Sequence, residues 1–381
     1  MDDSVAVMLD IGSFNIKAGF AGEDAPKVVI PTILGRPKHP GVLVGMDQKD
    51  FYVGAEAISK KHLLTLTTPV ADGKILDYDD LEHILTEMMN NELKSGFEDQ
   101  KVMVSEPPNT TLETRTQLAE LFFDQFEVRS LYFANQPVLS LYASARTTGT
   151  VVDCGHSVTY CVPIYEGYAI PHAILTMPIG GKALNEFMFS MLSKPGIMDK
   201  IEDDSFVFDI DVARQIKENN CIVAQDFDAE MKAASEQKTF ERRYTLPGST
   251  QEITLSTQLL KCPEMLFQPS VQGSKDLDGI HKYTFDAIMK CDTEIRRTLF
   301  KNIVLAGGTT AIEGMRERMK KEIQALAPSP MGPEVEAPAD RKFSQWLGGS
   351  ILSNLESFNH MWITKEQYKQ HGSAIIYRNC F

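Results

Sequence analysis

The same strand–turn–strand pattern occurs twice in this chain, and this repeat constrains the fold more than any other sequence feature. The first copy runs from an apolar strand at residues 5–9 into Asp10-Ile11-Gly12-Ser13 and then into a second apolar strand. In the second copy a strand at 150–152 leads into Asp153-Cys154-Gly155-His156-Ser157 and another apolar strand. Each copy has an Asp at the strand end and a Gly two residues later, which is typical of a tight hairpin turn. The repeat predicts two similar halves that face each other across a cleft.

Helical patterns separate and follow the two copies. Apolar residues recur at helical spacing in six segments: 79–93, 111–126, 136–145, 182–192, 212–224 and 280–290. A buried strand at 301–305 then leads into the turn Gly307-Gly308-Thr309 and a helix at 312–326. This alternation of strands and helices predicts an α/β protein. Three segments are expected to be loops or inserts: the glycine-bearing 36–54, the acidic 194–211, and 328–338, whose four prolines disfavour strand pairing.

Composition narrows the class of protein. The 381 residues carry a net charge of −14, and the resulting negative field disfavours direct membrane or sequence-specific nucleic-acid binding. The chain contains no apolar run of the ~18 residues that a membrane span needs, and its first residues do not resemble a signal peptide. Its six cysteines include no Cys-x-x-Cys pair, so they are expected to be buried thiols in a reducing compartment. We therefore expect a cytoplasmic protein.

Three glycine turns after buried strands predict a phosphate site, because such turns can present backbone N–H groups to phosphate oxygens. They are Gly12-Ser13, Gly155-His156-Ser157 and Gly307-Gly308-Thr309. Lys17 follows the first turn closely, and Asp10 and Asp153 suit a magnesium ion, which is usually held by one or two carboxylates, waters and phosphates. Each turn alone is also typical of an ordinary hairpin. Neither a Walker loop nor a Rossmann fingerprint is present, so the three turns together predict a nucleotide cleft of another kind.

At these residues the chain resembles the actin family along nearly its whole length. The string Lys17-Ala18-Gly19-Phe20-Ala21-Gly22-Glu23-Asp24-Ala25-Pro26 is very close to the first phosphate-loop region of actin, and residues 39–50 resemble its DNase-binding loop. Further near matches lie at 138–144, 163–168, 262–264, 266–270, 348–352 and the terminal Cys380-Phe381.

The resemblance implies the actin-type ATPase fold, which has two similar lobes around a nucleotide cleft, each with a large and a small subdomain. The first lobe would comprise a large subdomain at 1–31, 69–143 and 344–381 and a small one at 32–68. The second would comprise a large subdomain at 144–179 and 275–343 and a small one at 180–274. ATP or ADP with Mg²⁺ or Ca²⁺ would lie between the lobes.

The resemblance also assigns roles to individual residues. Phosphates would contact Gly12, Ser13, Lys17 and the turn formed by Gly155, His156 and Ser157. Asp10 and Asp153 would hold the cation through water, and Gln136, with Asp153, would serve catalysis by positioning the attacking water. The nucleoside would contact Lys217 and Glu218, and Gly307, Gly308, Thr309 and Lys342 would close over base and phosphates.

Several residues depart from the actin pattern. Phe14 replaces a glycine of the first turn, which makes that turn bulkier. His156 replaces an acid near the cation, and Tyr160 replaces a histidine associated with the catalytic water. Asp72 stands where actin has its methylated histidine, and Ile312 stands where a tyrosine stacks near the base. Any hydrolysis of ATP is therefore expected to be slow.

Partner surfaces follow from the same resemblance. Longitudinal contacts would use the loop 39–52, Tyr168 and the C-terminus, and an apolar groove would be lined by Tyr142, Ile351, Leu352 and Leu355. The loop 271–276, which in actin helps join filament strands, is longer and more polar here. Partners would be other actin-family subunits or a multi-protein complex.

Three classes of function follow. The first is an actin-related structural subunit of a motor, axonemal, dynactin-like or chromatin complex. The second is a divergent actin that polymerises, and the third is a sugar-kinase or chaperone-type ATPase. The expected location is the cytoplasmic cytoskeleton, with a nuclear or ciliary pool as an alternative.

Overall fold

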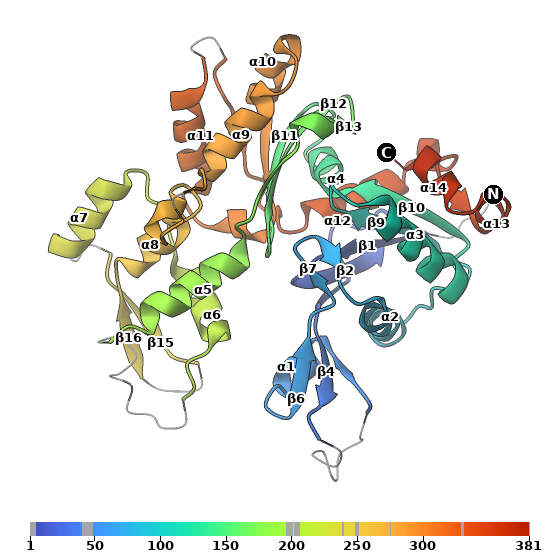
Figure 1. Ribbon diagram of the computed structural model, residues 1–381, viewed down its shortest axis with the longest axis horizontal. Coiled ribbons are helices and arrows are strands. Elements are labelled where there is room, and N and C mark those ends of the chain that lie inside the picture. Colours follow the sequence, from blue (N-terminus) through green and yellow to red (C-terminus); the bar gives the residue numbers. More distant parts are fainter. Residues whose placement is uncertain are drawn as a thin grey trace. The chain divides into compact units, whose positions relative to one another are not determined.

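The computed structural model describes residues 5–39, 49–195, 201, 206–237, 240–247, 251–274, 276–328 and 331–380. The chain forms two compact units (Figure 1). Unit 1 comprises Met1–Thr147, Glu166–Ala169 and Phe343–Phe381, and unit 2 comprises Thr148–Tyr165 and Ile170–Lys342. Each unit is therefore built from separate stretches of sequence. The division of each lobe into large and small subdomains stays a prediction.

A mixed six-stranded sheet forms the centre of unit 1, in the order β19-β10-β9-β1-β2-β3. Its strands are β1 (Val7–Ile11), β2 (Asn15–Phe20), β3 (Val28–Pro31), β9 (Lys101–Glu106), β10 (Ser130–Asn135) and β19 (Ile363–Thr364). The middle strand β1 pairs antiparallel with β2 and parallel with β9. Asp10 stands opposite Lys17 in one pairing and opposite Ser105 in the other.

The helices of unit 1 include α2 (Tyr78–Glu87), α3 (Leu112–Glu120), α4 (Gln136–Ala143), α12 (Ser344–Ser353), α13 (Lys365–His371) and α14 (Ala374–Asn379). Two π-helical turns, Met88–Leu93 and Leu121–Gln125, continue α2 and α3, so the predicted helices 79–93 and 111–126 have the expected extents. The indole of Trp346 on α12 is fully buried and donates to Met8 O at 3.0 Å. On the same helix a Cβ at Gly348 would lie 1.8 Å from Leu139 O, so α12 and α4 pack backbone to backbone.

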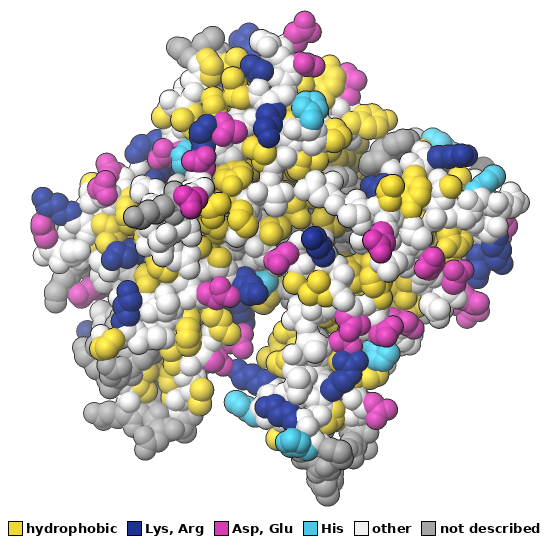
Figure 2. Space-filling model, viewed as in Figure 1, with side chains coloured by type: hydrophobic (Ala, Val, Ile, Leu, Met, Phe, Trp, Pro, Cys, Tyr) yellow, Lys and Arg dark blue, Asp and Glu magenta, His cyan; other side chains and the backbone are white. Residues whose placement is uncertain are grey.

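A smaller three-stranded sheet of unit 1 has the order β5-β4-β6, with β4 (Leu34–Pro37), β5 (Tyr52–Val53) and β6 (Leu64–Thr67), and α1 (Gly54–Ser59) packs against it. A two-stranded ribbon, β7 (Val70–Ala71) with β8 (Lys74–Ile75), follows it along the chain. Lys, Arg and His side chains gather over this small sheet (Figure 2). They include the exposed Arg36, Lys38, His39 and His62, so a basic patch stands out on an acidic protein.

The main sheet of unit 2 repeats the arrangement around β1. The strands that unit 2 contributes to this sheet are β11 (Gly149–Cys154), β12 (Thr159–Tyr165), β14 (Leu175–Met177), β17 (Ile303–Ala306) and β18 (Val335–Glu336), with β14 pairing with β12. As β1 does, β11 pairs antiparallel with the next strand, β12, and parallel with a strand much later in the chain, β17. Asp153 stands opposite Tyr160, just as Asp10 stands opposite Lys17. The register of the two sheets thus confirms the internal repeat.

The helices of unit 2 are α5 (Gly181–Leu192), α6 (Ile210–Asn220), α7 (Phe227–Gln237), α8 (Gln258–Glu264), α9 (Ile280–Met289), α10 (Thr293–Lys301) and α11 (Met315–Leu326), and β15 (Arg242–Thr245) pairs with β16 (Glu252–Leu255). Three predicted boundaries need correction. Lys301 ends α10 instead of starting a strand, and α6 ends at Asn220. A 3-10 turn, Gly308–Ala311, precedes α11, whose N-cap Gly314 has φ +84°.

The proline-rich segment 328–338 was expected to lack strand pairing, and this expectation was wrong. Val335 and Glu336 pair in parallel with Ile303 and Val304 of β17. Pairing is possible because the strand is only two residues long and neither of its residues is a proline.

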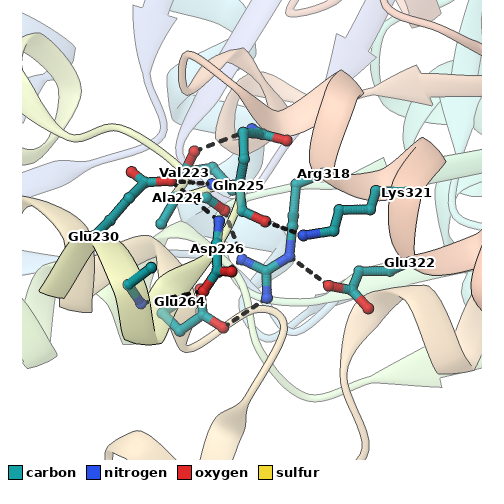
Figure 3. Close-up of polar contacts among 10 residues, drawn as sticks. Val223, Ala224, Gln225, Asp226, Glu230, Glu264, Arg318, Lys321 and Glu322 are labelled. Carbon is teal, nitrogen blue, oxygen red and sulfur yellow. Dashed lines mark hydrogen bonds and ion pairs between the residues drawn. The ribbon is translucent and has the colours of Figure 1, made fainter. Parts of the chain in front are cut away.

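Buried charge ties the helices of unit 2 together (Figure 3). The guanidinium of Arg318 on α11 binds both oxygens of Glu264 on α8, each at 3.0 Å, and also donates to Ala224 O at 2.6 Å. Arg318 is 4% exposed and Glu264 is fully buried. The backbone of Gln225 also joins this network, accepting from the Lys321 ammonium at 2.5 Å and donating to the Glu230 carboxylate at 2.7 Å. A charge pair with this degree of burial and two parallel hydrogen bonds fixes the geometry between the two helices.

Five predicted features lie wholly or partly outside the described residues. They are most of the loop 39–52, much of the acidic segment 194–211, Lys275 of the loop 271–276, residues 329–330 of the segment 328–338, and Phe381. No helix within the described ranges is long and apolar enough to cross a membrane.

Candidate functional site

In unit 1 the candidate site centres on Asp10, which is fully buried at the end of β1. One carboxylate oxygen accepts from the Lys17 ammonium at 2.5 Å, and the other accepts from the Ser105 hydroxyl at 2.6 Å. The amide nitrogen of Gln136, the first residue of α4, donates to Ser105 Oγ at 3.1 Å and to Asp10 Oδ1 at 3.3 Å. The structure thus brings Asp10, Lys17 and Gln136 together. With its nitrogen bound in this way, the Gln136 amide can use its carbonyl oxygen to orient a water.

The first glycine turn joins β1 to β2 beside this cluster. Gly12 N donates to Asn15 O at 3.1 Å, and Gly12 O accepts from the hydroxyl of the buried Thr32 at 2.7 Å. Phe14, at the position where actin has a glycine, is half-buried, and its backbone oxygen accepts from Thr32 N at 2.9 Å. Thr32 therefore holds the turn from both sides of Ser13.

In unit 2 the second glycine turn is held against the start of α5. Gly155 O accepts from Gly181 N at 2.9 Å and from the Thr309 hydroxyl at 2.8 Å, while His156 O accepts from Lys182 N at 2.7 Å. A Cβ at Gly180 would lie 2.6 Å from His156 O, so only glycine allows this approach. The turn and the helix start therefore form one rigid cradle.

Lys217 on α6 reaches this cradle from below the surface of unit 2. It is 5% exposed, and its ammonium lies 3.5 Å from Gly181 O. Burial lowers the pKa of Lys217, and no ion pair with a carboxylate occurs for it in the described part of the chain. The next residue, Glu218, faces solvent and forms an ion pair with Arg214 at 3.3 Å. A buried ammonium of this kind is a good partner for an anionic ligand.

The imidazole of His156 is mostly buried in the turn. Burial, together with the positive charges of Lys217, Lys182 and Arg214, lowers the pKa of His156 to about 4. The ring is therefore neutral near pH 7 and can donate one hydrogen bond and accept one. Tyr160, the other departure near the expected catalytic water, is buried on β12 opposite Asp153.

The third glycine turn lies directly against the second copy of the repeat. Gly307 has φ +81°, and a Cβ there would lie 2.3 Å from Cys154 O and 2.6 Å from an oxygen of Asp153. Gly308 is exposed with open space around it, whereas Thr309 is buried against Gly155. Arg341 closes the loop, since its backbone oxygen accepts from Gly307 N at 3.1 Å, and the exposed Lys342 follows it.

The donor set fits an anion better than a metal bound directly by the protein. Among the described residues no group of three His, Cys, Asp or Glu side chains is placed to hold a metal ion. Both oxygens of Asp10 are already hydrogen-bonded. A cation beside Asp10 would therefore be held largely by phosphates and waters, with the carboxylate acting through water.

Sequence reasoning missed several groups that build these two clusters. Ser105 lies beside Asp10 only because β9 pairs with β1, and the two strands are far apart in the sequence. The following Glu106-Pro107 could have indicated that a strand ends near Ser105. The pair Gly180-Gly181 opening an apolar helix was a usable signal for a close backbone approach. Lys182 and Arg214 carried no such signal.

The proposed contact residues of unit 1 differ in exposure. Tyr168, Ile351 and Leu355 are exposed by 61%, 42% and 47%. Tyr142 and Leu352 are half-buried and pack on the core of unit 1. Cys380 is 2% exposed, and its thiol sulfur accepts from Phe133 N at 3.3 Å, so its side chain belongs to the core and not to a contact surface.

The family model described as Actin matches residues 1–381, which is the whole chain. The repeated hairpins, the glycine turns and the mixed sheets agree with that match. The protein is therefore a member of the actin family and has the actin-type fold.

Proposed function

We propose that this protein binds ATP or ADP with a divalent cation and acts mainly as a structural subunit of a larger cytoskeletal assembly in the cytoplasm. The main support for nucleotide binding is the buried Lys217 ammonium, because a buried positive charge favours an anionic partner and this one lies at the cradle formed by the Gly155 turn and the start of α5. Lys17 offers a second ammonium beside the Gly12 turn of unit 1. Family membership supports a nucleotide as the anion.

Nucleotide binding can be tested by thermal melting. The melting temperature of nucleotide-free protein should rise as ATP or ADP is added with Mg²⁺, because a ligand that binds only the folded state stabilises that state. Lys217→Met removes the buried charge and should weaken the shift, whereas Lys282→Met removes a charge from an exposed ion pair and serves as the control. An unchanged melting temperature with both nucleotides would refute the proposal.

Hydrolysis, if it occurs, is expected to be slower than in conventional actins. Gln136 is held by Asp10 and Ser105 in a position to orient water. By the resemblance to actin, Tyr160 replaces a histidine associated with the catalytic water and His156 replaces an acid near the cation. The loss of one well-placed polar contact commonly costs roughly 10²–10³ in rate. Single-turnover phosphate release as fast as that of a conventional actin would contradict this expectation.

The preference for a subunit over a self-polymerising actin comes from the loop 271–276. Val271 ends a 3-10 turn, Pro269–Val271, and is partly buried against the core of unit 2, so it is not an exposed apolar anchor. Burying such an anchor contributes about 1.5–3 kcal/mol, and without it the concentration needed for a two-stranded filament should rise by an order of magnitude or more. Sedimentation of the pure Mg-ATP form decides between the two, since robust filaments at low micromolar concentration would favour the polymerising alternative.

A further inference from the structure

The guanidinium of Arg341 joins its own segment to the third glycine turn, residues 307–310. Its Nε and Nη2 both donate to Thr310 O, at 3.2 and 3.0 Å, and its Nη1 donates to Pro338 O at 2.8 Å. The backbone of the same residue accepts from Gly307 N at 3.1 Å and donates to Pro338 O at 3.3 Å. Arg341 therefore holds both the first and the last residue of this turn.

The turn that Arg341 holds has little stability of its own. It belongs to a single 3-10 turn, Gly308–Ala311, and 3-10 hydrogen bonds have poorer geometry than those of an α-helix. Gly307 and Gly308 start it, and glycines lose more conformational entropy on ordering than other residues. A Cβ at Gly308 would meet no atom within 4 Å, so packing does not fix this residue. The ordered form of the turn therefore depends on contacts from outside it.

The turn also contacts the second copy of the repeat. The hydroxyl of Thr309, which is buried, donates to Gly155 O at 2.8 Å. A Cβ at Gly307 would lie 2.6 Å from Asp153 Oδ1, so the turn lies directly against the end of β11. The third turn is thus held by Arg341 at Gly307 and Thr310 and by the Gly155 turn at Thr309.

We propose that the Arg341 guanidinium is a clamp that keeps the third glycine turn closed and thereby limits the rate at which a bound nucleotide leaves. This inference rests on the proposed nucleotide binding, in which Gly308 and Thr309 close over the ligand. A loop that covers a ligand has to open before the ligand leaves, so the population of the open form sets the dissociation rate. Arg341 is a positioning residue in this scheme, because it acts through the turn and not on the reacting atoms.

Loss of the guanidinium should act mainly on nucleotide release. It removes the two hydrogen bonds to Thr310 O, whereas the bond from Gly307 N to the backbone oxygen of residue 341 can remain. Hydrogen bonds from a charged donor are stronger than those between neutral groups. We expect Arg341→Gln to raise the open population, and with it the dissociation rate, about tenfold, with little change in the association rate.

Hydrogen exchange in the nucleotide-free, full-length protein tests the clamp without any ligand. In Arg341→Gln the amides of Gly307 and Thr310, which donate to Arg341 O and Gly307 O, should exchange about tenfold faster than in wild type. The amides of β17 should keep their wild-type rates. Arg316→Gln is the matched control, since Arg316 Nε donates to Val335 O at 2.9 Å, a carbonyl of β18 and not of the turn.

Two results of this exchange experiment would overturn the inference, whether or not nucleotide binds. One is unchanged exchange of the turn amides in Arg341→Gln. The other is equal acceleration of the turn and of β17, which would indicate a general loss of stability and no local clamp. If Arg341→Gln does not fold, Arg341→Lys takes its place, because it keeps the charge but not the planar fork of donors, and the same results in it decide the question.

Release of a fluorescent etheno-ATP, bound together with Mg²⁺, measures the consequence for the ligand. Wild type, Arg341→Gln and Arg316→Gln are loaded with this probe, and its loss is followed after excess unlabelled ATP is added. We expect release to be about tenfold faster from Arg341→Gln alone, with similar association rates for all three proteins. Faster exchange of the turn amides with an unchanged release rate would overturn the role of Arg341 in retention and leave the proposed function intact. Failure of wild type to bind the probe would refute the proposed function and the inference together.

Discussion

The buried pair of Arg318 and Glu264 gives the sharpest prediction about stability. Replacing Arg318 by Met keeps most of the side-chain volume but leaves the carboxylate of Glu264, which is fully buried, without its bidentate partner. It also removes the hydrogen bond to Ala224 O and the contact of the guanidinium with the Phe267 ring at 4.8 Å. Removing one partner of a buried pair typically destabilises by about 3–5 kcal/mol, because an uncompensated charge stays buried. We expect Arg318→Met to destabilise unit 2 by about that amount.

The double variant Arg318→Met with Glu264→Met distinguishes the cost of an unpaired buried charge from the cost of altered packing. Replacing both members of a buried pair by apolar residues is often neutral or even stabilising, so the double variant should recover most of the loss. Lys282→Met with Asp286→Asn is the matched control, since this pair lies on the surface with side chains 37% and 36% exposed and should contribute at most about 1 kcal/mol.

Hydrogen exchange measures these effects within unit 2. Protection of the amides of α8 and α11 reports the opening free energy of the helices that the pair joins, and it does not require the whole chain to unfold in one step. A loss below about 1 kcal/mol in Arg318→Met, or a double variant no more stable than the single one, would refute the reasoning.

Three further predictions concern other residues. Protonation of His156 alone should lower the free energy of unfolding of the nucleotide-free protein by about 3 kcal/mol between pH 6.5 and 4, because the pKa of His156 is lowered to about 4 in the folded state and the unfolded chain takes up the proton first. His156→Asn should therefore lose less stability than wild type over this range, and an equal loss in urea titrations of the two proteins would contradict this. Gly348→Ala, whose Cβ would meet Leu139 O at 1.8 Å, should lower the melting temperature markedly, whereas Gly308→Ala, with open space, should not. Gln136→Ala should slow single-turnover hydrolysis roughly 10²–10³-fold with little change in nucleotide affinity, and an unchanged rate would exclude its role in positioning water.

The sequence predicted best where local pattern and tertiary pairing agree. The Asp-x-Gly turns at Asp10 and Asp153 lie between continuous apolar strands, and β1 and β11 pair as the repeat predicted. The helix α12 was not predicted, because Gly348 and Gly349 lower its intrinsic helix propensity; close packing on Leu139 and Met8 requires the glycines nevertheless. The short α8 was missed for a related reason, since Pro263 lies inside it.

The candidate site was predicted as a set of residues but not as a set of contacts. The pairing of Asp10 with Lys17 follows from hairpin register, which a sequence can indicate. The hydrogen bond from Ser105 depends on a parallel strand almost a hundred residues later, and no local pattern encodes it. The positive surroundings of His156 likewise arise only when α5 and α6 pack beside the turn.

The discontinuous makeup of unit 1 has a consequence for how the chain is made. Trp346 and Gly348 pack against Met8 and Leu139, so the core begun by the first residues is completed only by the last ones. The residues of unit 2 are synthesised in between, from Thr148 to Lys342 apart from the short Glu166–Ala169 segment. At typical translation rates this delay lasts roughly 10–40 s, during which the face of β1 that α12 will cover lies open to other chains. Until its C-terminal helices pack, the nascent chain therefore exposes apolar core residues of unit 1 and should be more prone to aggregation than the completed protein.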